Sequence, residues 1–311
     1  MSGVVAIAGG TGHLGRALAD AIKAEGKHAV LVLARKWTEE KEKEIGHNIL
    51  QVDYTDIPAL TRLLCANDVS TVISAINSDT SVDSEWALFR AAEAAKSVKR
   101  YIPSLWGIEY TEDIASYFPA GRAKMELLRT LEASELETTM VLNGFFADYF
   151  VAPKVPSYFQ PLPLAIDIPF NTAAIPGSGE VPAVFTHTWD VAKFVAKLID
   201  APKWDRKSYI IGDKVTWNEF LRIAEEAKGV KFNTTYDDME ILKEGRITEL
   251  PSHPYVYPFL PKEVLQRLLA SFGVMIEEGV FDFRPERTVN GMFPEVKVRG
   301  VRELVEAAWK V

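Results

Sequence analysis

The first apolar stretch of the chain runs into a cluster of glycines. Residues 4–8 are small or β-branched apolar residues without polar alternation, which is typical of a parallel strand buried on both faces. After the glycines, Leu14 and Leu18 begin an apolar pattern with spacings near three and four that predicts a helix. A strand that turns tightly into a helix directs backbone N–H groups and the positive end of the helix dipole toward one point. The hydrophobic pattern therefore predicts an anion-binding turn.

The spacing of the glycines in this turn, G-x-x-G-x-x-G, is a variant of the dinucleotide fingerprint. Dinucleotide sites need glycine for the tight turn, for the close approach of the pyrophosphate and for the packing of the helix on the strand. A purely structural turn between strand and helix is the alternative interpretation. If the turn binds a dinucleotide, we expect the contacts to come from Gly9, Thr11, Gly12, His13, Leu14 and Gly15.

Further strand-like segments alternate with helical patterns along the first half of the chain. Between them lie stretches with helical spacing, and Asp56 is placed to cap a helix that contains Leu60 and Leu64. This rhythm predicts an α/β fold with a doubly wound parallel sheet of the Rossmann type, and it leaves the strand order open. The predicted strands cover residues 29–33, 48–52, 71–75, 100–103 and 138–142.

Two basic residues, Arg35 and Lys36, follow the second predicted strand, where the adenosine ribose of a dinucleotide lies. An acidic residue at this place favours NAD, because it accepts hydrogen bonds from the ribose hydroxyls. The planar guanidinium of an arginine instead holds the 2′-phosphate of NADP. We therefore expect NADP(H) as the cofactor. The alternative is that these two residues only begin a solvated loop.

The loops that follow the other parallel strands are expected to line the ligand crevice. Asp53 faces the adenine ring in one interpretation and is a plain turn residue in the other. Phe145 walls the nicotinamide in one interpretation and belongs to the core in the other. The cofactor contacts expected on these loops are Asp53, Ala75, Asn77, Ser104, Asn143 and Phe145.

A lysine lies near the start of a predicted amphipathic helix that contains Leu127 and Leu131. Because the first turn of a helix disfavours positive charge, another interaction is expected to favour Lys124 there. Held near a cofactor and partly desolvated, its ammonium is a candidate proton donor and cofactor contact. The alternative is a solvent-exposed helix lysine.

The second half of the chain breaks the rhythm of strand and helix. Prolines and turn residues prevail over residues 153–182, which predicts an irregular excursion from the sheet. Asp190 is expected to cap an amphipathic helix, and Thr216 to cap another. The expected boundaries are a dinucleotide-binding domain at 1–150, completed by about 186–211, and a smaller, discontinuous α+β substrate-binding domain at 151–185 and 212–311.

A loop at residues 252–258 interrupts a helical and aromatic stretch and contains His253. Binding groups concentrate on loops mounted on a rigid frame, so this loop is a candidate wall of the substrate pocket. His253 is the second candidate acid or base, and an exposed loop histidine is the alternative. Residues 208–211 are expected to form a strand, and residues 295–310 a short strand and a helix.

Composition restricts the class of protein. The 311 residues are 48% hydrophobic, which is enough for a sizeable core. A net charge of −8 argues against a nucleic-acid-binding face. Cys65 lies in an apolar helical pattern and is expected to be a buried, inert thiol. Without a leader-like or membrane-length apolar segment, we expect a cytoplasmic protein that binds a small molecule and neither membrane, nucleic acid nor metal.

Four features together resemble the NmrA-like and isoflavone-reductase-like branch of the atypical short-chain dehydrogenases. They are GGTGHLG at 9–15, KRYIPSLWG at 99–107, Lys124, and VLNGFFADYF at 141–150. The resemblance implies that Lys124 matches the lysine that lies by the nicotinamide and, in the plant reductases, assists proton transfer. It also implies that the proline-rich excursion helps to build the substrate pocket.

One feature of typical short-chain dehydrogenases is absent. Their catalytic tyrosine lies four residues before the lysine, and position 120 of this chain is alanine. No other tyrosine has a spacing that restores the motif, whether Tyr101, Tyr110 or Tyr117. The usual Ser-Tyr-Lys mechanism therefore cannot be assumed.

The leading functional hypothesis is an NADPH-dependent reductase of a small, largely apolar metabolite of aromatic or polyketide-like type. Nicotinamide C4 gives a hydride to an electrophilic carbon, and Lys124 stabilises or protonates the developing oxyanion. Some proteins of the family that the chain resembles bind NADP without turnover and contact a transcription factor, so a dinucleotide-sensing regulator is an alternative. A third hypothesis keeps the cofactor site for a redox-neutral isomerisation or elimination.

Overall fold

The computed structural model describes residues 3–77, 81–118 and 120–311, and these form two compact units. The first unit comprises Met1–Leu142, Val191–Ile210 and Thr288–Val296. The second unit comprises Asn143–Asp190, Ile211–Arg287 and Lys297–Val311. Both units are discontinuous in sequence. The first boundary falls after Leu142, where the sequence suggested residue 150, and the first unit also takes up a segment near residue 290.

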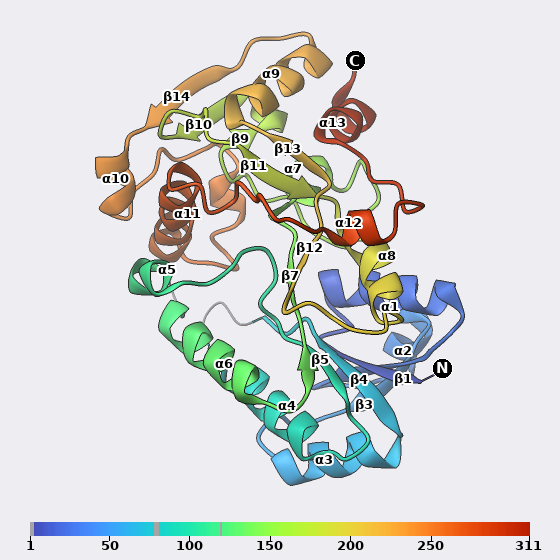
Figure 1. Cartoon of the computed structure of the whole chain (residues 1–311). Coiled ribbons are helices and arrows are strands. Elements are labelled where there is room, and N and C mark those ends of the chain that lie inside the picture. The colour runs from blue at the N-terminus through green and yellow to red at the C-terminus, as the bar shows by residue number, and fades with distance from the viewer. Residues whose placement is uncertain (1–2, 78–80, 119) are drawn as a thin grey trace. The chain divides into compact units, whose positions relative to one another are not determined.

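The first unit is built on a six-stranded parallel sheet (Figure 1). Its strands are β1 (Val4–Ala8), β2 (Ala29–Ala34), β3 (Asn48–Gln51), β4 (Val69–Ser74), β5 (Arg100–Ile102) and β6 (Glu137–Thr138). The order β3-β2-β1-β4-β5-β6 reverses the direction of winding between β1 and β4. Such a reversal opens a crevice outside the carboxyl ends of the strands. The Rossmann-type sheet expected from the sequence is therefore confirmed, with its strand order now defined.

The helices of the first unit follow the strands in the predicted rhythm. Several of them begin where a side chain satisfies a free N–H group of the first turn, as Asp56 does by accepting a hydrogen bond from the N–H of Ala59 at 2.8 Å. The helices are α1 (His13–Glu25), α2 (Glu39–Ile45), α3 (Ile57–Ala66), α4 (Asp83–Ala94), α5 (Glu112–Tyr117), α6 (Gly121–Ala133) and α12 (Val289–Met292), and α8 (Thr188–Leu198) contributes its larger part.

The strand predicted at 138–142 is broken in two. Its first part, β6, pairs with β5, whereas β7 (Met140–Leu142) pairs in parallel with β12 (Lys207–Tyr209) in a separate two-stranded sheet. The break falls at Thr139, whose buried hydroxyl hydrogen-bonds the hydroxyl of Ser208 at 2.8 Å. A strand that changes partners cannot be recognised from hydrophobicity alone, because the pattern of apolar residues does not say which strand lies beside each part.

The second unit contains two three-stranded sheets and short helices. One sheet has the order β13-β11-β8 and the other β14-β10-β9. The strands are β8 (Phe145–Phe146), β9 (Ile166–Asp167), β10 (Thr172–Pro176), β11 (Ala183–Thr186), β13 (Asp213–Val215) and β14 (Asn233–Asp237). The helices are α7 (Asp148–Val151), α9 (Trp217–Lys228), α10 (Met239–Lys243), α11 (Lys262–Glu277) and α13 (Val301–Trp309), with 3₁₀ turns at Ile168–Phe170 and His253–Tyr255.

Three local expectations are corrected by the structure. Asp190 lies inside α8, because the carboxylate of Asp148 accepts a hydrogen bond from the N–H of Thr188 at 2.8 Å and starts the helix earlier. Residues 295–300 form no strand. The Cys65 side chain is exposed, because it follows Leu64 on α3 and falls beside the apolar stripe, outside it. Among the helices that the structure describes, none combines the length and the apolar character needed to cross a membrane.

Candidate functional site

The glycine turn lies at the switch point of the sheet, between the ends of β1 and β4. Gly9 has φ +75°, and a Cβ added to it would lie 2.5 Å from the carbonyl oxygen of Ala75, the first residue after β4. A Cβ on Gly15 would lie 2.3 Å from the carbonyl oxygen of Gly9. The N–H of Gly12 donates to the same Gly9 oxygen at 2.9 Å, which closes the turn. The glycines are therefore required for both the conformation and the close packing of the turn.

Helix α1 begins directly in this turn. Gly12 is its N-cap, and none of the described side chains caps it by a hydrogen bond. The residues that surround this helix end are Thr11, which is half-buried, and Gly12 and His13, which are exposed, whereas Leu14 is buried against the unit. Desolvation by the surrounding protein atoms nevertheless lowers the pKa of His13 and so favours its neutral form. An uncapped helix N-terminus beside a tight glycine turn suits a phosphate group.

The end of β2 carries the two basic residues expected to select the cofactor. Arg35 and Lys36 are both exposed where the strand leaves the sheet. In the neighbouring loop, the Asp53 carboxylate accepts hydrogen bonds from the N–H and the hydroxyl of Thr55 at 2.8 and 2.7 Å, and these bonds lower the pKa of Asp53. The local geometry of Asp53 is that of a turn residue.

The loops after β4 and β5 are tied together at their start. The hydroxyl of Ser104, which follows β5, donates to the carbonyl oxygen of Ile76 at 2.6 Å. Ala75 is half-buried beside Gly9, and Asn77 is exposed. These predicted contact residues therefore gather at the same edge of the sheet as the glycine turn. Residues 78–80 lie outside the described part.

A buried carboxylate that the sequence did not single out holds these two loops. Glu85 on α4 is fully buried, and its carboxylate accepts hydrogen bonds from the N–H of Ser104 at 3.0 Å, from the Tyr101 hydroxyl at 2.8 Å and from the Ser74 hydroxyl. The pKa of Glu85 is raised, because the effect of burial outweighs the opposite effects of these hydrogen bonds and of the charge of Lys124. A glutamate in the first turn of a helix is usually exposed to solvent and interacts with the positive end of the helix dipole, so only the structure reveals that Glu85 is buried.

Lys124 lies near the start of α6 and is only 3% exposed. Its ammonium donates a hydrogen bond to the hydroxyl of Tyr110 at 3.0 Å and lies 4.9 Å from the centre of the Tyr110 ring. The ring centre of Phe118 is 5.6 Å away. The solvent-exposed interpretation of Lys124 is therefore wrong. Tyr110 is also a residue that the sequence analysis considered and set aside, because its separation from the lysine differs from the usual motif.

Two predicted cofactor contacts, Asn143 and Phe145, belong to the second unit. Asn143 is fully buried, and among the described residues its side-chain oxygen has no hydrogen-bond partner. Phe145 is buried in an aromatic cluster and stacks on Phe281 with ring centres 3.9 Å apart. The packing of Phe145 agrees with the core interpretation.

His253 also lies in the second unit and is 1% exposed, contrary to the exposed loop histidine considered above. Its Nδ1 accepts a hydrogen bond from the N–H of Leu250 at 3.0 Å, and its Nε2 is 2.9 Å from the carbonyl oxygen of Pro163. Burial lowers the pKa of His253, which favours the neutral ring that these two bonds require. With both ring nitrogens engaged, His253 holds two loops together and has no free nitrogen for proton transfer.

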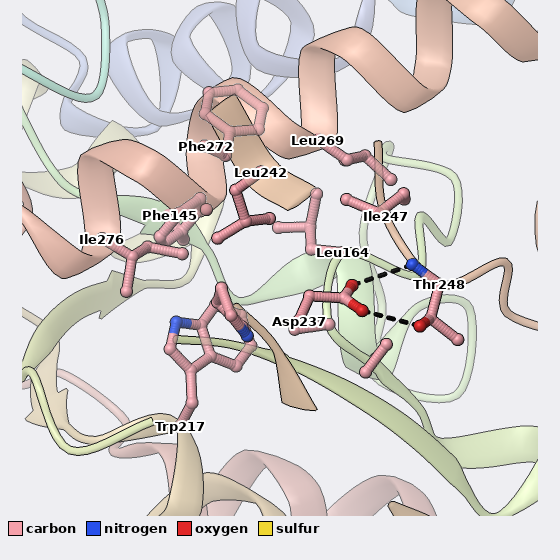
Figure 2. A pocket seen from close by; sticks show the side chains of 14 residues that line it. Phe145, Leu164, Trp217, Asp237, Leu242, Ile247, Thr248, Leu269, Phe272 and Ile276 are labelled. Carbon is pink, nitrogen blue, oxygen red and sulfur yellow. Dashed lines mark hydrogen bonds between the residues drawn. The ribbon is translucent and has the colours of Figure 1, made fainter. Parts of the chain in front are cut away.

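The second unit contains a largely apolar pocket (Figure 2). Its polar wall is made by Asp237, whose carboxylate accepts hydrogen bonds from the N–H and the hydroxyl of Thr248 at 2.8 and 2.6 Å. Figure 2 shows this pair at one side of the pocket, with aromatic and aliphatic side chains around the rest. The apolar lining includes Phe145, Trp217, Leu242, Leu269, Phe272 and Ile276.

Comparisons with known proteins agree on one family. The model of the NmrA-like family matches residues 1–303. The chain is 38% identical to oxidoreductase BOA1 of Botryotinia fuckeliana over 73% of this chain and 77% of that protein. It is 28% identical to oxidoreductase swnN of Metarhizium robertsii over 98% and 97% of the two chains. The leucoanthocyanidin reductase–NADPH complex from Vitis vinifera superposes with a TM-score of 0.75 at 21% identity, covering 98% of both chains.

Proposed function

This chain is an oxidoreductase of the NmrA-like family, and we propose that it reduces a small, largely apolar metabolite by hydride transfer from NADPH. The observation that carries the proposal is the glycine turn at the β1/β4 switch point, with Arg35 at the end of β2. Because the glycines of this turn have no side chains, a pyrophosphate can come close to the backbone. NADP(H) is the cofactor, as in the related reductase from Vitis vinifera.

Different residues of the first unit are proposed to bind different parts of the cofactor. The N-terminus of α1, with Thr11 and His13, faces the pyrophosphate with its N–H groups. Arg35, supported by Lys36, pairs with the 2′-phosphate through its planar donor fork. The loops held by Glu85 lie at the carboxyl ends of β4 and β5, where the nicotinamide half of a dinucleotide binds in folds of this kind. When bound, NADPH supplies the hydride from nicotinamide C4.

Lys124 supplies the positive charge that reduction of a polarised bond requires. Its charge lowers the pKa of the Glu85 carboxyl group, which accepts a hydrogen bond from the N–H of Ser104, and this interaction supports a role for Lys124 beside these loops. A desolvated ammonium stabilises an oxyanion more strongly than a hydrated one, because the local dielectric constant is low. Lys124 thus serves the oxygen or leaving group of the substrate, as its match to the family lysine implies.

The chemistry of the second unit supports the proposed substrate class. Its pocket is lined by aromatic and aliphatic side chains, and the Asp237 carboxylate there is already paired with Thr248. The aromatic and aliphatic character of this unit supports an uncharged aromatic or polyketide-like substrate over a phosphorylated one. Asn143, whose buried side-chain oxygen lacks a partner among the described residues, remains a proposed contact for a bound N–H group.

The first test is calorimetric binding of NADPH and NADH to the wild-type protein, to Arg35→Ala and to the control Arg62→Ala, an exposed arginine on α3. We expect NADPH to bind at least about tenfold more tightly than NADH, because a charge-assisted hydrogen bond contributes about 1.5–3 kcal/mol. The preference should disappear in Arg35→Ala and persist in Arg62→Ala. Equal binding of both cofactors, or binding of neither, would overturn the cofactor assignment.

The second test is a screen of aryl ketones, enones and benzylic ethers for NADPH oxidation, with Lys124→Ala as the control. Reduction of one class that depends on Lys124 supports the reductase. NADPH binding without turnover of any acceptor favours the sensing regulator, because a sensor needs only the nucleotide half of the site. Conversion of an acceptor without net NADPH oxidation favours the isomerase or lyase.

A further inference from the structure

The first unit contains a buried tyrosine–lysine pair that the sequence motif does not predict. Lys124 Nζ donates to the Tyr110 hydroxyl at 3.0 Å, and the two side chains are 3% and 5% exposed. Typical short-chain dehydrogenases bring such a pair together by a spacing of four residues on one helix. Here the tyrosine comes from the loop between β5 and α5, fourteen positions before the lysine.

The loop that carries Tyr110 is fixed at several points within the first unit. The indole N–H of Trp106 donates to the carbonyl oxygen of Ser74 at 2.9 Å, and the N–H of Gly107 donates to the carbonyl oxygen of Val141 at 3.3 Å. Leu105 and Ile108 are buried. A loop anchored in this way holds the phenol in one place, so the Tyr110–Lys124 contact is built into the unit.

The Tyr110 hydroxyl has an unused donor. Its oxygen accepts a hydrogen bond from Lys124, and no described residue accepts a hydrogen bond from its O–H group. Buried hydroxyl groups normally use their proton, because an unsatisfied donor away from water costs free energy. A hydroxyl that receives a hydrogen bond from an ammonium and offers its own proton is arranged to give that proton to an acceptor on a ligand.

We propose that Tyr110 is a catalytic residue of this chain, giving its proton to the substrate, and that Lys124 restores that proton. The proposal rests on the reductase function proposed above. As the hydride reaches the electrophilic carbon, the electron pair of the polarised bond moves to its oxygen, which takes the proton of Tyr110. The phenolate then receives a proton from Lys124 along their hydrogen bond, and solvent water returns a proton to the lysine. One hydride and one proton enter the substrate, and NADPH becomes NADP⁺.

The test compares Tyr110→Phe, Lys124→Met and the double variant, with Tyr236→Phe as the matched control. Tyr236 is 54% exposed in the second unit, and its hydroxyl donates to Asn218 at 3.0 Å. We expect Tyr110→Phe to lower kcat by about 10²–10⁴-fold, the range for general acid catalysis, with the Kd of NADPH unchanged. Because the pair acts in series, the double variant should lose no more activity than the worse single variant. Full activity of Tyr110→Phe, or effects that multiply in the double variant, would overturn the proposal.

A second measurement does not depend on turnover. In protein labelled with ¹³C at the lysine Cε, the signal of Lys124 is identified by its loss in Lys124→Met. It should shift in Tyr110→Phe and stay in place in Tyr236→Phe. If the signal moves as expected but no acceptor oxidises NADPH, the reductase function fails although the pair exists. If acceptors are reduced and the Lys124 signal does not shift in Tyr110→Phe, the reductase function stands and the proposed role of Tyr110 is refuted.

Discussion

A Cβ on Gly15 would lie 2.3 Å from the carbonyl oxygen of Gly9. The atoms that this Cβ would meet belong to the backbone of Gly9 and Gly10, so no side chain can move aside to admit a methyl group. We predict that Gly15→Ala lowers stability by about 1–3 kcal/mol, as overpacking does, and weakens NADPH binding at least about tenfold. Denaturant unfolding and calorimetry measure the two effects. Gly291→Ala is the control, because its Cβ would only touch the Thr288 hydroxyl at 3.5 Å. A Gly15→Ala protein with normal NADPH affinity would contradict the assignment of this turn.

Glu85 makes a pH-dependent prediction. Burial raises the pKa of the Glu85 carboxyl group in the folded protein above its value in the unfolded chain. The contribution of this group to stability is therefore complete at a pH below its unfolded-state pKa, and it is lost as the pH rises through its folded-state pKa. Glu85→Gln removes this titration and keeps an acceptor for Tyr101 and the N–H of Ser104. The melting temperature of Glu85→Gln relative to wild type should therefore be more favourable at pH 8 than at pH 5. Glu93→Gln, an exposed change on the same helix, is the control. A pH-independent difference would show that the carboxyl group does not titrate in this range.

The glycine turn, the alternation of strands and helices and the caps at Asp56 and Thr216 were predictable, because each depends on residues that are neighbours in the sequence. The contacts that give the first unit its chemistry are different. Tyr110 meets Lys124, and Glu85 meets Ser104, only after a loop and a helix have packed. Hydrophobic periodicity carries no information on such pairs. It also cannot reveal that a polar residue such as Glu85 or His253 is buried with its hydrogen bonds satisfied.

His253 is expected to stabilise the second unit. His253→Ala leaves the N–H of Leu250 and the carbonyl oxygen of Pro163 without their partner, at a cost of about 1–3 kcal/mol for each buried group. Because burial lowers the pKa of His253, the wild-type protein should lose stability as the pH falls below about 6.5, where the unfolded chain takes up a proton first. Chemical denaturation at pH 5.5 and 7.5 tests both statements, and His253→Ala should show the smaller difference between them. A variant of normal stability that had lost only kcat would instead point to a catalytic histidine.

Cys65 provides a direct check on the exposed side of α3. Its side chain is exposed, so it should react with a thiol reagent such as dithionitrobenzoate in the native protein without denaturant. One thiol should react for each chain, since the sequence contains a single cysteine. Cys65→Ser should abolish the reaction and leave NADPH binding unchanged, because α3 carries none of the proposed cofactor contacts. If the thiol reacted only after unfolding, the result would support the buried position that was expected from the sequence.

The preference between NADPH and NADH should reverse in Arg35→Asp. Arg35 is exposed at the end of β2, so an aspartate there can be accommodated without a change in packing. A carboxylate repels the 2′-phosphate of NADPH and accepts hydrogen bonds from the ribose hydroxyls of NADH. Arg35→Lys keeps the charge but loses the planar donor fork, so its NADPH affinity should lie between those of the wild type and Arg35→Ala. Dissociation constants for both cofactors with all three variants give this order. If Arg35→Asp still preferred NADPH, the 2′-phosphate would be held elsewhere, and Lys36→Ala would be the next variant to measure.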